Sequence, residues 1–366
     1  MCMLLDDDSC VWVWGINHVM FPLFKKRKDR FIQYTPVKLP LPKPLRKIIV
    51  QVAVGCSQFH LLDSEGSVWS SGCYKQHHSE KQIVKQDLPP MIRIEASNCI
   101  SLYVDTEHIC WVTSTMPFDG EEDPYPANCP FGSPKPLEGL PPMEDPSLSI
   151  SLHCPGISLV EIDAGDIWVF GLGNLTGKRE ELGDQPIPVP LGNLGQASGQ
   201  VRSLSSDGST FYITDNLGEV WYYKKVWDFE NLGKEDPLAL TRIQGIPEMR
   251  KVVCAGLVTL YLDMENNVWV SGISRSGALG LGDVYQQGEP IVNPAFGKAV
   301  DIFACYNCSG CITEDRMIFV CGANSTSGAL GLKSSINNVF SPVRIKKAPK
   351  PARKPEKCFT KSARSK

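Results

Sequence analysis

Asp263-Met264-Glu265-Asn266-Asn267-Val268-Trp269-Val270-Ser271-Gly272 is the stretch that decides the fold of this 366-residue chain. An acidic residue is followed by a polar turn and by a short apolar run that contains a tryptophan, and a glycine stands three residues after the tryptophan. An aspartate side chain can accept hydrogen bonds from backbone N–H groups two residues further on and so begin a turn. The stretch therefore predicts a β-hairpin whose second strand ends in Trp-x-x-Gly.

This hairpin pattern recurs seven times along the chain. The aromatic residues are Trp12, Trp69, Trp111, Trp168, Trp221, Trp269 and Phe319. The glycines three positions later are Gly15, Gly72, Gly171, Gly272 and Gly322, and Ser114 and Lys224 take the other two places. The preceding acids are Asp6, Asp63, Asp105, Asp163, Asp215, Asp263 and Glu314. The copies are spaced by about 51 residues, and a strand-built repeat of that length is typical of β-propellers. We interpret the aromatic and glycine residues as structural anchors, with the tryptophans in the core between blades.

Two further strands are predicted in the repeat. An innermost strand precedes the hairpin and carries small residues near its end, as strands that converge on an axis require. The candidates are 48–55, 91–97, 148–155, 200–206, 250–256 and 299–305. Outer strands that begin with Pro-Val are expected at 36–39, 188–191 and 342–345, since proline is tolerated at strand starts and edges. The prediction is an all-β, seven-bladed propeller over residues 1–345, followed by a disordered basic tail over residues 346–366.

The first blade is one strand short in this count. Seven tryptophan-type strands are present but only six innermost strands, because Met1 stands almost inside the first hairpin. Either the first blade lacks a strand, or residues upstream of Met1 complete it. The sequence leaves both readings open.

The sixth copy carries a resemblance to a known family. Val268-Trp269-x-x-Gly272, followed by the loop Gly277-Ala278-Leu279-Gly280-Leu281-Gly282, resembles the repeat of the regulator of chromosome condensation family, and residues 328–332 repeat the loop. The resemblance covers roughly residues 4 to 345. It implies a propeller that binds proteins or acts as a guanine nucleotide exchange factor for a Ran-like small GTPase.

Departures from the family pattern bear on the choice between these two functions. The family histidine that follows the innermost strand is kept only at His60, and copies one to five lack the glycine-rich loop. If these signatures face a GTPase, their loss weakens exchange activity. We therefore expect a protein-interaction scaffold with weak or no exchange activity, and keep the exchange factor, held on chromatin by the basic tail, as the alternative.

Three segments outside the repeat are candidates for partner binding. Residues 115–147 hold nine prolines and the acids Glu121, Glu122 and Asp123, which fits a disordered spacer or a loop that contacts a GTPase. The run Lys25, Lys26, Arg27 and Lys28 fits a solvated loop or a contact to phosphate or an importin. The tail has nine basic residues against one acid; its candidates are Lys346, Lys347, Lys350, Arg353 and Lys354. Such a tail can contact DNA, direct nuclear import or simply solubilise the chain.

Composition excludes several other classes. The net charge of −3 gives no overall attraction to nucleic acid or membrane, and no apolar run approaches the length of a spanning helix. Acids at positions 6–8 interrupt any signal peptide, so we expect a monomer in the cytoplasm or nucleus that is not secreted. Its 14 cysteines should then be reduced. Catalytic motifs are lacking, so no enzyme chemistry and no cofactor are expected. The run Cys305-x-x-Cys308-x-x-Cys311 lacks a recognisable fourth metal ligand and is interpreted as strand, not as a metal site.

Overall fold

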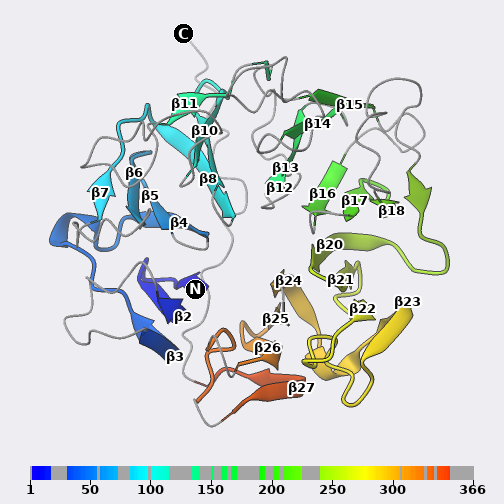
Figure 1. Cartoon of the computed structure of the whole chain (residues 1–366). Helices are drawn as coiled ribbons and strands as arrows, with labels where there is room; N and C mark the ends of the chain where they lie inside the picture. The colour runs from blue at the N-terminus through cyan, green and yellow to red at the C-terminus, as the bar shows by residue number, and fades with distance from the viewer. Residues whose placement is uncertain are drawn as a thin grey trace, which may run out of the picture.

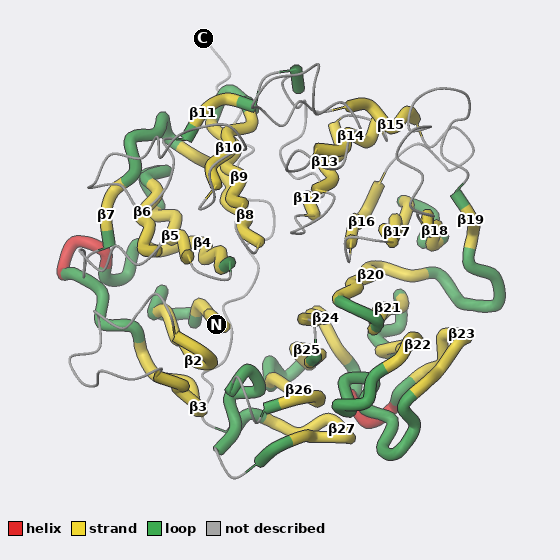
Figure 2. Tube along the Cα trace, viewed as in Figure 1, coloured by secondary structure: helices red, strands yellow, loops and turns green. Residues whose placement is uncertain are grey.

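Seven antiparallel sheets surround a central axis in the computed structural model (Figure 1). The described residues are 2–17, 31–55, 58–72, 83–97, 100–114, 134–137, 139–140, 150–151, 158–162, 166–170, 189–193, 201–206, 210–224, 240–305, 307–324, 328–333 and 336–346. Among them the helical elements are two short 3₁₀ turns, Lys43–Leu45 and Pro294–Phe296 (Figure 2). The prediction of an all-β propeller is confirmed.

The strands follow the repeat in order, from the axis outward. The first sheet holds β1 (Cys2–Leu5), β2 (Val11–Asn17) and β3 (Phe31–Lys38). The second holds β4 (Ile49–Val54), β5 (Gln58–Asp63), β6 (Val68–Gly72) and β7 (Val84–Lys85), and the third holds β8 (Met91–Ser97), β9 (Ile100–Asp105), β10 (Cys110–Ser114) and β11 (Lys135–Pro136). The fourth holds β12 (Ile150–Ser151), β13 (Ser158–Ile162), β14 (Asp166–Phe170) and β15 (Val189–Asn193).

The remaining three sheets complete the ring. The fifth holds β16 (Val201–Ser206), β17 (Thr210–Asp215), β18 (Val220–Lys224) and β19 (Thr241–Arg242). The sixth holds β20 (Met249–Ala255), β21 (Val258–Asp263), β22 (Val268–Ile273) and β23 (Gln286–Val292), and the seventh holds β24 (Ala299–Cys305), β25 (Cys308–Thr313), β26 (Ile318–Ala323) and β27 (Asn338–Arg344).

Two features of the fold differ from the prediction. The ring contains six complete four-stranded blades and not seven, because the described residues of the first repeat form three strands and lack the innermost one. The proline-rich segment 115–147 is also not all insert. Strand β11 and the buried Leu137 lie within it, so this segment supplies the outer strand of the third blade. Proline fits there because β11 is an edge strand.

One carboxylate holds the hairpin turn in five of the repeats, in an arrangement that we call the aspartate clamp. In the sixth blade Asp263 Oδ1 accepts hydrogen bonds from the backbone N–H groups of Glu265 and Asn267, and Oδ2 accepts one from the indole Nε1 of Trp269 at 2.9 Å. Burial acts to raise the pKa of Asp263, but the hydrogen bonds from Trp269 and Asn267 outweigh it and hold the pKa below its usual value. The acid, the turn and the tryptophan of the sequence pattern are thus one hydrogen-bonded unit.

Five copies of the clamp are described. They pair Asp6 with Trp12, Asp63 with Trp69, Asp105 with Trp111, Asp215 with Trp221 and Asp263 with Trp269. The tryptophans are partly exposed, yet Trp69, Trp111 and Trp269 pack against buried clusters that join two neighbouring sheets, as the prediction of packing between blades requires. Each of the five also closes its clamp through the indole N–H. Asp163 and Gly171 of the fourth copy lie outside the described residues, and Trp168 lies in β14 opposite Val160.

The seventh copy replaces both partners of the clamp together. Phe319 has no indole N–H to donate, and the position equivalent to Asp263 is taken by Thr313 and not by Glu314. The Thr313 hydroxyl accepts a hydrogen bond from the Met317 N–H at 3.1 Å, and so keeps the turn closed. The acid predicted at Glu314 therefore stands one residue away from the clamping position.

The glycine of Trp-x-x-Gly is required by a close approach between strands. Gly272 has a φ of 116°, and a Cβ there would overlap the carbonyl oxygen of Leu257 in the turn between β20 and β21. That carbonyl accepts a hydrogen bond from the Ile273 N–H at 2.8 Å. Gly322, with a φ of 113°, stands in the same relation to Asn307. The glycine thus lets the inner turn lie directly on the tryptophan strand.

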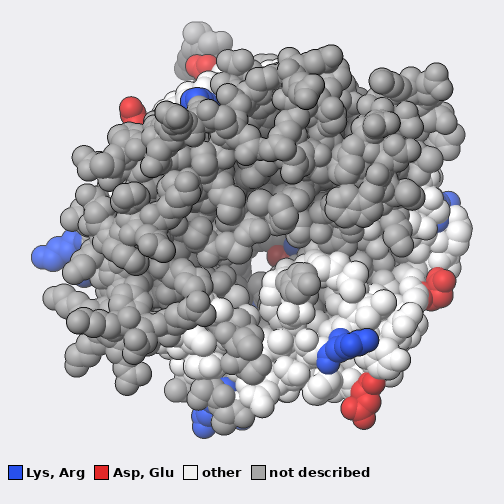
Figure 3. All heavy atoms as spheres, in the orientation of Figure 1, with Lys and Arg blue, Asp and Glu red and all other residues white. Residues whose placement is uncertain are grey.

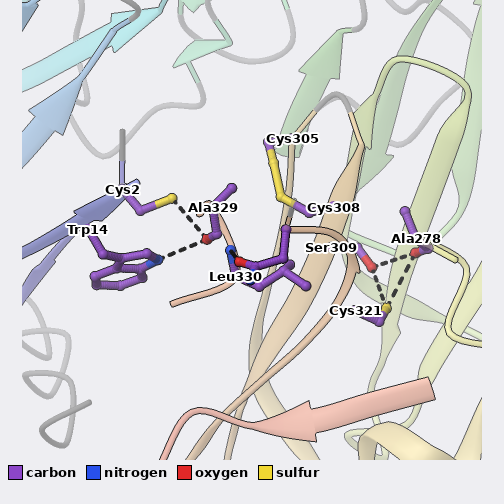
Figure 4. The surroundings of a disulfide bond; sticks show 10 residues. Cys2, Trp14, Ala278, Cys305, Cys308, Ser309, Cys321, Ala329 and Leu330 are labelled. Carbon is purple, nitrogen blue, oxygen red and sulfur yellow. Dashed lines mark hydrogen bonds between the residues drawn. A yellow bond between two sulfur atoms is a disulfide. The ribbon is translucent and has the colours of Figure 1, made fainter. Parts of the chain in front are cut away.

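Glycine-rich loops fasten neighbouring sheets. The Ala278 carbonyl accepts hydrogen bonds from Ser309 Oγ at 2.5 Å and Cys321 Sγ at 3.6 Å of the seventh blade. The Ala329 carbonyl, in the second loop, accepts from Cys2 Sγ at 3.4 Å and Trp14 Nε1 at 2.8 Å of the first sheet. These are the same two positions of the repeat, as Figure 4 shows. The seventh blade therefore holds the first sheet through the same kind of hydrogen bonds by which the sixth blade holds the seventh. Among the described residues, no covalent link joins the seventh blade to the first sheet.

Replacing Asp263 with alanine tests the clamp. We expect a loss of about 3 kcal/mol in the free energy of unfolding, because two partly buried turn N–H groups and the Trp269 indole lose a charged acceptor. Denaturant unfolding followed by tryptophan fluorescence measures it. The exposed neighbour Glu265→Ala is the matched control and should change stability by less than about 0.5 kcal/mol. Equal losses in both variants would contradict the role given to Asp263.

Candidate partner-binding edge

Most of the sequence-predicted binding residues lie outside the described part of the chain. These are Lys25, Lys26, Arg27, Lys28, Glu121, Glu122, Asp123, Lys347, Lys350, Arg353 and Lys354. Lys346 is described and exposed, directly after the buried Ile345 at the end of β27. The basic tail thus leaves the ring from the outer strand of the seventh blade.

The first sheet turns an unpaired strand toward the axis. In the six complete blades the strand nearest the axis is β4, β8, β12, β16, β20 or β24, whereas in the first sheet it is β1, the equivalent of the second strand elsewhere. No strand among the described residues pairs with the inner side of β1. In Figure 1 the N-terminal end of the chain lies beside the axis, between β4 and β24. Within the described residues, a row of backbone N–H and C=O groups is therefore left without a strand partner there.

In the complete blades, hydrogen bonds and an ion pair connect an innermost strand to the innermost strand of the next blade. The Gln51 amide exchanges hydrogen bonds with the backbone of Ile94, at 2.7 and 3.1 Å. Ser205 Oγ accepts from the Cys254 N–H at 2.9 Å, and Lys251 pairs with Asp301 at 2.6 Å. Alternate side chains of each innermost strand thus point to the next blade. From β24 the next sheet is the first, where no described innermost strand receives them.

Apolar side chains on both sides of this gap are consequently exposed. Phe303 and Val300 on β24 are 37% and 43% exposed. Val50 on β4 is 49% exposed, but it is equivalent to Arg250, whose side chain reaches the next blade, so Val50 is not counted beside the gap. Among the described side chains of innermost strands, these are the only exposed large hydrophobics. Val52 is partly exposed, whereas its equivalents Ile94, Val252 and Ile302 are at most 1% exposed.

We call the inner side of β1, together with Val52, Val300 and Phe303, the open edge. It combines unpaired backbone groups with flanking apolar side chains, which is the chemistry that an added β-strand satisfies. Figure 3 shows an opening at the centre of the molecule, and the charged residues described on that face are scattered and form no single-sign patch. The surface therefore favours an extended apolar segment over a nucleic-acid backbone.

Sequence reasoning missed these residues, although a signal for them existed. The deficit of one innermost strand in the first repeat was visible in the chain. What the sequence did not provide was the neighbour relation between β24, β1 and β4, which arises only when the ring closes. Phe303 and Val52 therefore looked like ordinary strand residues.

The retained family histidine lies inside the molecule. His60 is 0% exposed, with Nδ1 at 2.6 Å from Ser70 Oγ and Nε2 at 2.7 Å from Ser101 Oγ of the third blade. Gln58 Nε2 donates to Ser101 Oγ at 2.7 Å, and burial lowers the pKa of His60 to about 3. This neutral histidine joins two blades. The hypothesis that it faces a GTPase is wrong.

The glycine-rich loops are also structural. Ala278, Leu279 and Leu330 are 0% exposed and belong to the core between the sixth blade, the seventh blade and the first sheet. Loss of such loops in the other repeats therefore removes packing contacts and does not by itself remove partner contacts. The absence of these loops is therefore weaker evidence that exchange activity has been lost.

The cysteine expectation requires one correction. Cys305 and Cys308 form a disulfide, because the register of β24 and β25 places them directly opposite each other. Six other described cysteines form no disulfide: Cys2, Cys10, Cys110, Cys254, Cys311 and Cys321.

No group of three or more metal-binding side chains occurs in the described part of the chain. Within the same residues, none of the helical segments has the length and apolarity that crossing a membrane requires.

Known proteins share the architecture. No family model matches the chain. The X-linked retinitis pigmentosa GTPase regulator of Homo sapiens is 26% identical over 193 residues, which are 50% of this chain and 17% of that protein. Prp20p from Saccharomyces cerevisiae, described with its binding properties to Gsp1p and histones, superposes with a TM-score of 0.71 at 18% identity, over 94% of this chain and 87% of its own. Human WBSCR16 superposes with a TM-score of 0.70 at 18% identity, over 94% and 95% of the two chains.

These likenesses agree with the repeat pattern read in the sequence. The chain has the fold of a regulator of chromosome condensation-like propeller. The matched region is about a sixth of the length of the human GTPase regulator, so activities of that whole protein are not transferred by the match.

Burial of His60 makes stability depend on pH. The unfolded chain takes up a proton near pH 6.5 whereas the folded chain does not until about pH 3, so stability is full above pH 6.5 and falls as the pH drops below it. We expect His60 to cost about 2 kcal/mol between pH 7 and pH 5. Urea unfolding at the two pH values measures this, and His60→Gln should remove that part of the dependence. An unchanged dependence in the variant would place the titration elsewhere.

Proposed function

We propose that this propeller is a protein-interaction scaffold that binds an extended segment of a partner polypeptide along the open edge. The observation that supports it is the inner side of β1, with which no described strand pairs, flanked by the exposed Phe303 and Val300 on one side and by the partly exposed Val52 on the other. Strand addition satisfies the free backbone groups and covers the apolar side chains at the same time. Specificity then comes from the alternate side chains of the added strand.

The complete blades indicate what sequence fits. In β20 the buried residues are Met249, Val252, Cys254 and Ala255, and β8 repeats the pattern with buried Met91 and Ile94. Apolar residues at the first and fourth positions face the neighbouring blades, and a small residue follows at the sixth. We therefore propose a partner segment of about seven residues with this pattern and without proline, since a proline would remove a ladder hydrogen bond.

Other parts of the chain contribute to this proposal as secondary contacts. Residues 1–345 act as one unit. The tail that begins at Lys346 contacts nucleic acid or chromatin. Loss of DNA retention when residues 346–366 are deleted would support this contact. The basic run from Lys25 to Lys28 and the acids Glu121 to Asp123 are proposed as additional partner contacts. We propose a monomer that works in the cytoplasm or nucleus.

Guanine nucleotide exchange on a small GTPase is the second candidate. The structural likeness to Prp20p and the sequence match to a GTPase regulator favour it. Exchange needs a surface that binds the nucleotide-free GTPase better than the loaded form, by several kcal/mol. No described residue supplies a reason to expect that difference, so the scaffold is preferred.

A synthetic peptide tests the open edge. A labelled peptide copying residues 249–255, with serine in place of Cys254, should bind the full chain and raise its own fluorescence anisotropy. Hydrogen exchange should then slow at the amides of Met3 and Leu5, because the added strand pairs with β1. Phe303→Ser should weaken binding about tenfold, since roughly 1.4 kcal/mol of apolar contact is lost.

Two controls match this experiment. Phe340→Ser removes a phenylalanine of similar exposure, 42%, from the outer strand β27 and should leave peptide affinity unchanged. The same peptide with proline at the position of Val252 should not bind. Equal weakening by both phenylalanine variants, or protection in the free protein of the Met3 and Leu5 amides, which alternate with the amides that face β2, would show that the open edge is not a partner site.

Nucleotide release tests the second candidate. The purified chain at micromolar concentration should accelerate release of a fluorescent guanine nucleotide from Ran less than about tenfold, because a small differential affinity shifts the exchange equilibrium little. Prp20p with its own GTPase serves as the positive control for the assay. Acceleration of a hundredfold or more would overturn the scaffold proposal in favour of exchange.

A further inference from the structure

We infer that Cys305 and Cys308 form a thiol–disulfide exchange site, which low-molecular-weight thiols of the glutathione class reduce and their disulfides re-form. The inference does not depend on partner binding at the open edge. It rests on where the two residues lie in the innermost hairpin of the seventh blade and on which of the two sulfur atoms solvent reaches.

The pair bridges the turn between β24 and β25. Cys305 ends β24, Cys308 begins β25, and the two are cross-strand partners with their Cα atoms 5.2 Å apart. Figure 4 shows the bond beside the loop that carries Ala329 and Leu330. Two thiols in this position are held within bonding distance by the hairpin itself, so oxidation needs no movement of the backbone.

The two sulfur atoms differ in access. Cys305 is exposed, whereas Cys308 is 6% exposed and belongs to the core cluster around the sixth and seventh blades. An incoming thiolate therefore meets the Cys305 sulfur first, and Cys308 is the leaving group. Paired thiols with one exposed and one buried sulfur can exchange with small thiols without unfolding the protein.

Four other described cysteines are buried. Burial raises the pKa of Cys110, Cys311 and Cys321 to about 12, and Cys254 is buried as well. A protonated, buried thiol is a poor nucleophile. Among the described cysteines of the complete blades, thiol chemistry is thus confined to the Cys305–Cys308 pair.

The fold does not need the bond. The equivalent turn of the sixth blade, between Ala255 and Val258, keeps the same strand register with no cross-link. The disulfide closes a very short ring, and closing so short a ring removes little entropy from the unfolded chain. Reduction therefore leaves a folded dithiol.

The thiol–disulfide exchange proceeds by two successive displacements at sulfur. A thiolate attacks the Cys305 sulfur, a mixed disulfide forms, and the bond to Cys308 breaks so that Cys308 leaves as a thiolate and takes a proton. A second thiolate attacks the sulfur of the bound small thiol, the small-molecule disulfide forms, and Cys305 leaves as a thiolate that takes a second proton. Two small thiols are oxidised while the protein disulfide gains two electrons, and the reverse steps re-form it.

Equilibration with glutathione tests the site. The full chain is held in buffers of increasing ratio of glutathione to glutathione disulfide, quenched with acid and alkylated, and its peptides are weighed by mass spectrometry. We expect Cys305 and Cys308 to become alkylated together as the ratio rises, while circular dichroism stays unchanged. A pair that stays oxidised in excess glutathione, or that stays reduced in excess glutathione disulfide, would overturn the inference.

Single variants identify the attacked sulfur. Cys308→Ser leaves the exposed Cys305 thiol, which should take up one glutathione from its disulfide. Cys305→Ser leaves the buried Cys308 thiol and is the matched control, which should take up none while the protein is folded. Equal uptake by both variants would contradict the assignment, and the titration of the unaltered chain decides the inference if either variant fails to fold.

Discussion

A single carboxylate at the start of the hairpin turn, described in five of the seven repeats, is the constraint on which the rest of the structure depends. Asp263 is 3% exposed, yet it is satisfied by two turn N–H groups and by the Trp269 indole. A buried charge is tolerated only with such partners. Because the same bonds fix both the turn and the tryptophan strand, each blade has its register set locally, and the blades can then pack as nearly equivalent units.

Contacts between blades repeat as regularly as the clamps, and this makes the first sheet unusual. The Ala278 and Ala329 carbonyls accept hydrogen bonds from equivalent positions of the next sheet. Away from the axis, the contact between neighbouring sheets therefore continues from the seventh blade to the first sheet. Near the axis the continuity fails in the described residues, because β1 has no innermost neighbour. The missing neighbour of β1 near the axis explains why Phe303 is exposed and Val52 is partly exposed in an otherwise well-packed ring.

Sequence pattern predicted the hairpins and innermost strands well, because their signals are local. The bounds expected for β8 and β24 agree with the structure residue for residue. Outer strands such as β11 were harder, since a two-residue edge strand inside a proline-rich segment carries almost no pattern. The pattern predicted that the tryptophans pack between blades, whereas their polar role, donation to an aspartate, is not visible from their apolar neighbours.

The sequence by itself determined the architecture of this protein: a period of about 51 residues, an acid and an aromatic at fixed spacing, and a glycine where two strands touch. These are local requirements of turn geometry, and they hold wherever the unit occurs. Only the tertiary structure decided that His60 is buried between two blades, that Cys305 and Cys308 are cross-strand partners, and that β1 lies open between β4 and β24. Those facts depend on which units become neighbours when the ring closes, and no pattern within one repeat specifies them.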